Sequence, residues 1–216
     1  DFWSRAIWRQ SIVNSLFIAV CATVLATALG TVAALGLSRP HMPFRTFIMG
    51  LLISPMIVPL IITAAGIFFF YARIGLTGTY LGIILAHTAL GTPFVVITVT
   101  ATLIGFDHSM TRAAAMCGAG PARVFFKVVM PLILPGVIAG ALFAFVTSFD
   151  EVVVVLFVAS VEQQTVPRQM WAGIREEISP TILAVATLLI VFSIAVMTTI
   201  ELLRRRSERL RGVTPA

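Results

Sequence analysis

The sequence is dominated by long apolar stretches, which lie at 12–37, 47–71, 80–104, 132–159 and 182–203. Each is long enough to cross the hydrocarbon core of a membrane as a helix, which takes about 20 residues. The stretches are rich in Ala, Gly and Leu and lack the period-2 alternation of barrel strands. We therefore expect an all-α protein, a polytopic transmembrane helical bundle with five visible spans.

The composition excludes a soluble domain. Of the 216 residues, 59% are hydrophobic and only 11% are charged, whereas a soluble domain has roughly 25% charged residues. A chain this apolar would expose large apolar patches in water. We expect residues 1–216 to form a single transmembrane domain, with a polar loop at 105–131 inside it.

The basic residues predict the orientation of the bundle. Ten of the 15 fall on one side of the predicted spans, including those at 105–131 and the arginine run after 203. The positive-inside rule places this side, with the C-terminus, in the cytoplasm. The arginine run indicates anchoring to anionic lipid rather than nucleic-acid binding. Because the exported N-terminus has no signal-like segment, we expect a sixth, earlier span in the full protein; a processed five-span protein is the alternative.

The polar loop at 105–131 predicts two short helices. Asp107 is a suitable N-cap for a first helix over 108–117, and Gly118 is a natural residue to end it. Alanines at 113–115 leave the surface of this helix nearly bare. A bare helix flanked by basic residues suits insertion into a groove on another protein. An ordinary surface helix between two spans is the alternative.

The second short helix is predicted by Gly120 and Pro121, which suit the N-cap and the first helical position. It would run to about residue 130. Pro131 would break it and start the next span.

The loop resembles the EAA loop of ABC-importer permeases, and within them most closely the spermidine/putrescine permeases. That motif reads Glu-Ala-Ala, three residues, Gly, nine residues, Ile, one residue, Leu-Pro. The residues at this spacing here are Arg112, Ala113, Ala114, Gly118, Val128, Met130 and Pro131. Arg112 stands where the family has Glu, so a salt bridge from that Glu to an ATPase cannot form in the same sense.

The resemblance implies the fold of a type I ABC-importer permease in a bacterial inner membrane. It implies that Arg112, Ala113, Ala114 and Gly118 couple the chain to a dimer of ATPase subunits. A second permease subunit and an extracytoplasmic substrate-binding protein would complete the importer. The chain has no G-x-x-x-x-G-K-[ST] phosphate loop, so we expect no cofactor on it and no enzyme activity; ATP and Mg would bind the ATPase.

Asp150 and Glu151 lie inside the fourth predicted span. An acid at the bilayer centre costs about 2.5–3.5 kcal/mol, so such residues usually face a cavity or a partner. Adjacent helical residues point about 100° apart, so the two acids cannot share a direction unless the helix is broken there. We expect Asp150 to line the substrate path and Glu151 to line it or to pair with a neighbour, with Phe145 and Phe149 beside them. A structural pair that caps a broken helix is the alternative.

Two further features are less specific. His87 is either a polar contact in the path or, more commonly for such a residue, a core hydrogen bond. The segment at 167–178 predicts a short amphipathic helix at the outer surface, with Trp171 as its interfacial anchor. By resemblance this helix would also touch the binding protein.

These observations favour the permease of an ATP-driven importer for a small organic cation such as a polyamine. Permeases for opines, γ-aminobutyrate-like compounds, iron or phosphonates would share the loop. An ion-coupled secondary transporter would show an inverted repeat and more intramembrane charges. No metal-ligand spacing or catalytic constellation supports a membrane enzyme.

Overall fold

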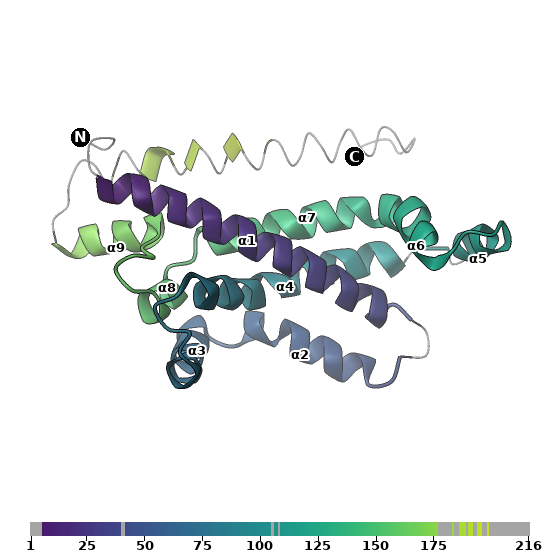
Figure 1. Ribbon diagram of the computed structural model, residues 1–216, viewed down its shortest axis with the longest axis horizontal. Coiled ribbons are helices and arrows are strands. Elements are labelled where there is room, and N and C mark those ends of the chain that lie inside the picture. Colours follow the sequence, from purple (N-terminus) through teal and green to yellow (C-terminus); the bar gives the residue numbers. More distant parts are fainter. Residues whose placement is uncertain are drawn as a thin grey trace.

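The computed structural model describes residues 6–39, 42–104, 106–107 and 109–176, with scattered positions between 183 and 198. Within these residues the regular structure is helical, as the sequence predicts (Figure 1). The elements are α1 (Ala6–Leu37), α2 (Arg45–Ile57), α3 (Leu60–Ile74), α4 (Tyr80–Ile104), α5 (Ser109–Met116), α6 (Pro121–Val124), a π-helical turn (Phe125–Val129), α7 (Met130–Phe149), α8 (Val153–Val158) and α9 (Val166–Glu176). The predicted span at 182–203 lies largely outside the described residues.

Helices α1, α4 and α7 form the centre of the bundle. They are the apolar helices long enough to cross a membrane unbroken in the described part of the chain, and they run side by side (Figure 1). Glycines allow their close approach: a Cβ on Gly30 of α1 would lie 2.6 Å from Val95 Cβ, and one on Gly136 of α7 would lie 2.7 Å from Thr102 Oγ1. The interfaces are therefore packed too tightly for larger side chains at these positions.

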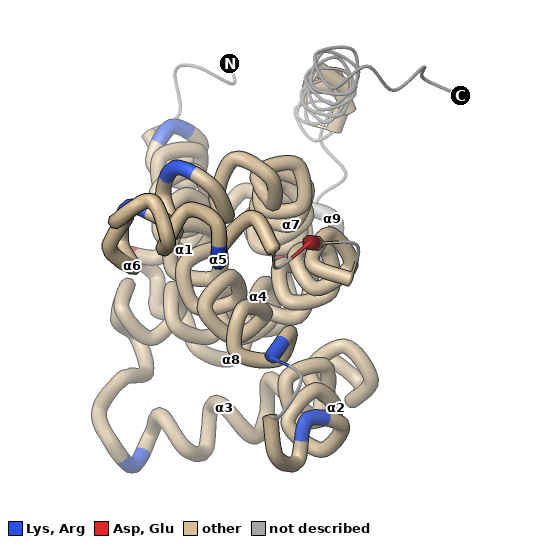
Figure 2. The backbone as a smooth tube through the Cα atoms, turned by 90° about the vertical axis from the view of Figure 1, so that its right-hand side faces the viewer, with Lys and Arg blue, Asp and Glu red and all other residues tan. Residues whose placement is uncertain are grey.

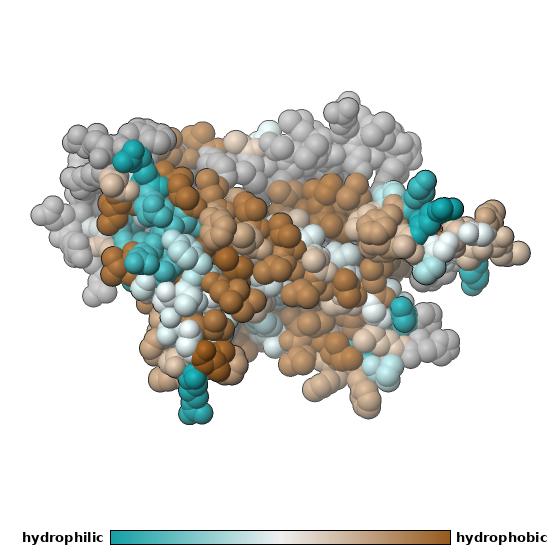
Figure 3. Space-filling model, in the orientation of Figure 1, coloured by the Kyte–Doolittle hydropathy of each residue, from teal (hydrophilic) through white to brown (hydrophobic). Residues whose placement is uncertain are grey.

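Charged and apolar residues are distributed as a membrane protein requires. Figure 2 views the molecule from the α5 end and shows Lys and Arg on α2, α5 and α6. Figure 3 shows a broad apolar band between hydrophilic groups at the two ends of the long axis. An apolar band of this kind is stable against lipid, which supports the membrane assignment.

The second predicted span, at 47–71, is not one straight helix. The structure divides it into α2 and α3, which meet at an angle of 102°. Val58 between them is extended (ψ 132°) and Pro59 begins the next turn. The residue before a proline avoids the helical region, so the bend falls where the sequence places Pro59.

The predicted break at Pro131 is wrong. A single helix runs from Pro121 to Phe149, because the turn over Phe125–Val129 is π-helical and the Met130 N–H bonds back to the Phe125 carbonyl. A widened turn relieves the clash between a proline ring and the turn before it. The fourth predicted span, at 132–159, instead breaks at its other end, between α7 and α8.

The amphipathic helix predicted at 167–178 is confirmed as far as Glu176, where the continuously described residues end. Helix α9 packs against the first turns of α1 through a cluster of Trp8, Ile12, Val166 and Met170. Trp171 is 49% exposed. The helix is therefore attached to the bundle as well as lying at its surface.

Candidate functional site

Helix α5 begins and ends where the sequence predicts. Both carboxylate oxygens of Asp107 accept hydrogen bonds from Ser109, one from its N–H (2.8 Å) and one from its Oγ (2.6 Å). At the other end Gly118 has φ +80°. The Ala119 N–H donates to the Ala114 carbonyl at 3.1 Å and the Gly118 N–H to the Ala115 carbonyl at 2.9 Å, which is the Schellman pattern. The Asp107 side chain thus fixes the start of this helix, and the left-handed backbone of Gly118 fixes its end.

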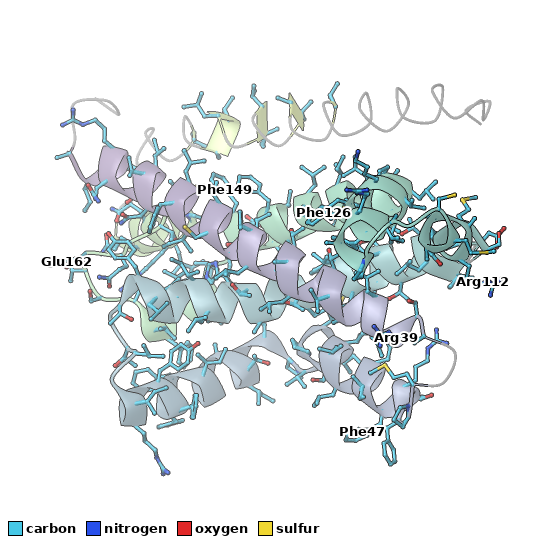
Figure 4. The ribbon with its side chains drawn as sticks, turned by 45° about the vertical axis from the view of Figure 1, so that its right-hand side comes forward. Arg39, Phe47, Arg112, Phe126, Phe149 and Glu162 are labelled. Carbon is cyan, nitrogen blue, oxygen red and sulfur yellow. The ribbon has the colours of Figure 1, made fainter. Side chains whose placement is uncertain are left out.

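The surface of α5 is open. Arg112 and Ala113 are exposed, Ala114 is half-buried, and Met116 is 89% exposed. Helices α5 and α6 project beyond the ends of the long helices (Figure 1), and Arg112 lies at the tip of this projection (Figure 4). A short, capped helix with small side chains, held away from the bundle, presents a compact surface to a groove on a partner.

The second helix of the loop also starts as predicted. Gly120 is the N-cap of α6 and Pro121 occupies its first turn. The aromatic rings of Phe125 and Phe126 follow in an edge-to-face pair with centroids 4.9 Å apart, and Phe126 is 66% exposed. The exposed phenylalanine adds an apolar group close to α5.

The two neighbouring acids have different surroundings because the helix breaks at them. Asp150 is the C-cap of α7, with its N–H bonded to the Val146 carbonyl, and its side chain is exposed. Glu151 is only 6% exposed, and its Oε1 accepts a hydrogen bond of 2.7 Å from the Val154 N–H. The break sends one carboxylate outward and the other into the protein.

Two aromatic rings stand on α7 one turn apart, beside this break. Phe145 and Phe149 are stacked, with centroids 5.7 Å apart and an interplanar angle of 16°. In Figure 4, Phe149 lies along the length of the bundle, with Arg112 toward one end and Glu162 toward the other. The rings and the exposed acid therefore lie within one short stretch of chain, 145–150.

His87 makes the core hydrogen bond that the sequence favoured over a path contact. Its Nδ1 lies 2.8 Å from Ser148 Oγ, and the ring is 1% exposed. The contact ties the second turn of α4 to the last turn of α7. Ser148 was not predicted, because nothing in the sequence pairs two residues 61 positions apart.

A polar network at the end opposite α5 was also missed. Asn14 of α1 is 2% exposed; its Nδ2 donates to the carbonyls of Glu162 (2.8 Å) and Gln164 (3.0 Å). Its Oδ1 accepts from Tyr80 Oη at 2.9 Å. An amide inside an apolar span was the available signal, since a buried polar group must find partners.

These features are those of a multi-pass helical membrane protein. Within the described residues no cluster of His, Cys, Asp and Glu is placed to hold a metal ion. The profile of the binding-protein-dependent transport system inner membrane components matches residues 9–209, and the chain belongs to this family. It is therefore a protein of the inner membrane.

Similar proteins agree with this assignment. The spermidine/putrescine transport system permease protein PotC of Haemophilus influenzae is 31% identical over 199 residues, covering 92% of this chain and 77% of PotC. The putrescine transport system permease protein PotI of Escherichia coli is 32% identical over 187 residues, covering 82% of this chain and 65% of PotI.

A solved structure shows the same fold. A chain of the inward-facing MetNI methionine ABC transporter superposes with a TM-score of 0.71 at 17% identity, covering 91% of this chain and 94% of that one. The expected fold, that of a type I ABC-importer permease, is confirmed.

Proposed function

We propose that the chain is the permease subunit of an ATP-driven importer that moves a small organic cation, such as a polyamine, into the cytoplasm. The observation that carries this proposal is the exposed carboxylate of Asp150 at the break between α7 and α8. An acid at membrane depth is costly unless it serves a path or a partner. The names of the PotC and PotI relatives support the substrate class.

The stacked rings of Phe145 and Phe149 complete the proposed path site. An aromatic face attracts a cation, and it also packs against a methylene chain. A flexible amine with charged ends and an apolar middle matches an acid beside two rings. At about 1.5 Å per residue, Asp150 lies roughly 28 Å beyond Pro131, which fits entry from the outer side.

Helix α5 is the proposed coupling element. Arg112, Ala113, Ala114 and Gly118 would dock on an ATPase dimer, which would bind the ATP and Mg. The support is the open surface of α5 and the caps that hold both its ends. Arg112 would meet a different polar partner from the usual Glu.

The orientation of the bundle suggests where the other subunits of the importer would bind. The α5 end would face the cytoplasm, together with the C-terminus, by the positive-inside rule. The opposite end, with α9 and the loop before it, would face an extracytoplasmic substrate-binding protein. A second permease subunit, a different chain from this one, would lie alongside it in the membrane.

Uptake by the reconstituted importer tests the substrate class. Proteoliposomes holding this chain with its ATPase, second permease and binding protein should accumulate labelled spermidine or putrescine only when ATP is inside. Uptake of a neutral or anionic solute, with no uptake of either amine, would contradict the proposal and favour a permease for another small solute.

A charge placed on α5 tests the coupling role. Ala113→Glu should abolish co-purification with the ATPase while the protein still inserts in the membrane. Ala72→Glu is the matched control, because Ala72 is equally exposed but lies near the far end of α3. Normal ATPase association of the Ala113→Glu protein would contradict the docking of α5.

A further inference from the structure

The break between α7 and α8 is anchored on both sides. Before it, Ser148 is bonded to His87 of α4 at 2.8 Å. After it, the Val158 carbonyl accepts a hydrogen bond of 2.8 Å from the Gly78 N–H. The valines at 154, 155 and 158 are buried in a cluster with residues of α1, α3 and α4. The two helix ends are therefore held in place by the rest of the bundle.

Glu151 lies between these two anchored helix ends, and its side chain bonds to the start of α8. The first N–H groups of a helix have no partners within it. The Glu151 carboxylate supplies one for α8, because its Oε1 accepts a hydrogen bond from the Val154 N–H at 2.7 Å. This is the action of a side-chain cap, in which an acceptor oxygen stabilises the start of a helix.

The neighbouring acid does not take part in this cap. Asp150 ends α7 with its backbone, and its side chain is exposed. Residues 150–152 thus form a short connection in which Glu151 points inward to α8 and Asp150 points out. The direction of the Asp150 side chain depends on the geometry that the cap holds.

We propose that Glu151 is a positioning residue whose carboxylate caps α8 and so fixes the helix break that presents Asp150 to the substrate. The cap itself follows from the contacts above, and only its effect on transport rests on the proposed function. A cap needs an acceptor oxygen and no net charge, whereas a cation-binding residue needs the charge. The two roles therefore respond differently to an amide.

Three variants of the assembled importer separate these roles. Glu151→Gln keeps an acceptor oxygen, and we expect labelled spermidine uptake within about threefold of the unaltered protein. Glu151→Ala removes the oxygen, and uptake should fall about fivefold or more, with a lower melting temperature. Asp150→Asn is the charge control: it should lower uptake without lowering the melting temperature.

Equal losses in Glu151→Gln and Glu151→Ala, with unchanged melting temperatures, would overturn the proposal and make Glu151 a cation ligand. If the Glu151→Ala protein fails to accumulate in the membrane while the Glu151→Gln protein accumulates normally, the proposal is supported, because the two variants differ in whether they keep an acceptor oxygen. If no variant and no unaltered protein transports an amine, the proposed function fails. The melting temperatures then still decide whether Glu151 caps α8.

Discussion

Gly118→Ala tests one physical requirement of the polar loop at 105–131, the left-handed backbone that ends α5. Gly118 has φ +80°, and a Cβ there would meet no atom within 4 Å. The added methyl group therefore causes no clash, and its cost is that of the left-handed backbone, about 1–2 kcal/mol. Such a cost lowers the ratio of the native to the non-native end of α5 by roughly 5- to 30-fold.

The matched control is Gly120→Ala, two residues away. Gly120 has φ −66° and ψ 162°, which alanine adopts readily, and the space around it is also open. Titration of the purified permease with its ATPase should show weaker association for Gly118→Ala and unchanged association for Gly120→Ala. Equal association of both variants and the unaltered protein would refute the argument that the end of α5 determines docking.

Two further predictions concern stability, measured as melting temperature in detergent. Asn14→Ala removes hydrogen bonds to Tyr80 and to two carbonyls of the loop before α9, costing about 2–3 kcal/mol, whereas Tyr80→Phe should cost about 1 kcal/mol. Equal losses would contradict this network. Gly136→Val places a side chain against Thr102 and should cost about 1–3 kcal/mol. Gly66→Val, where the space is open, should be nearly neutral, and similar effects of the two would disprove the close packing.

Features set by nearby residues were predictable from the sequence. The extent of α4 and the end of α1 follow from the apolar stretches, whereas α1 begins six residues before the predicted start of its span. Both ends of α5 follow from Asp107 and Gly118. These signals depend on membrane thickness and on local hydrogen bonds, which act within a few residues of the chain.

Features set by packing between distant segments were not predictable. The bend at Pro59 had a local signal, but the π-helical turn that carries the helix through Pro131 had none. The contact of His87 with Ser148 and that of Asn14 with the loop before α9 join residues 61 and about 150 positions apart. Their pairing depends on how the helices pack, which periodicity alone does not specify.

The most direct test of the central proposal is the kinetics of amine uptake by the Asp150→Asn importer. Loss of the charge should weaken the apparent affinity for labelled spermidine about tenfold, or roughly 1.4 kcal/mol. Association with the ATPase should remain normal, since α5 lies at the other end of the bundle (Figure 1). Unchanged uptake of both spermidine and putrescine would contradict the role of Asp150 as the residue that receives the cation.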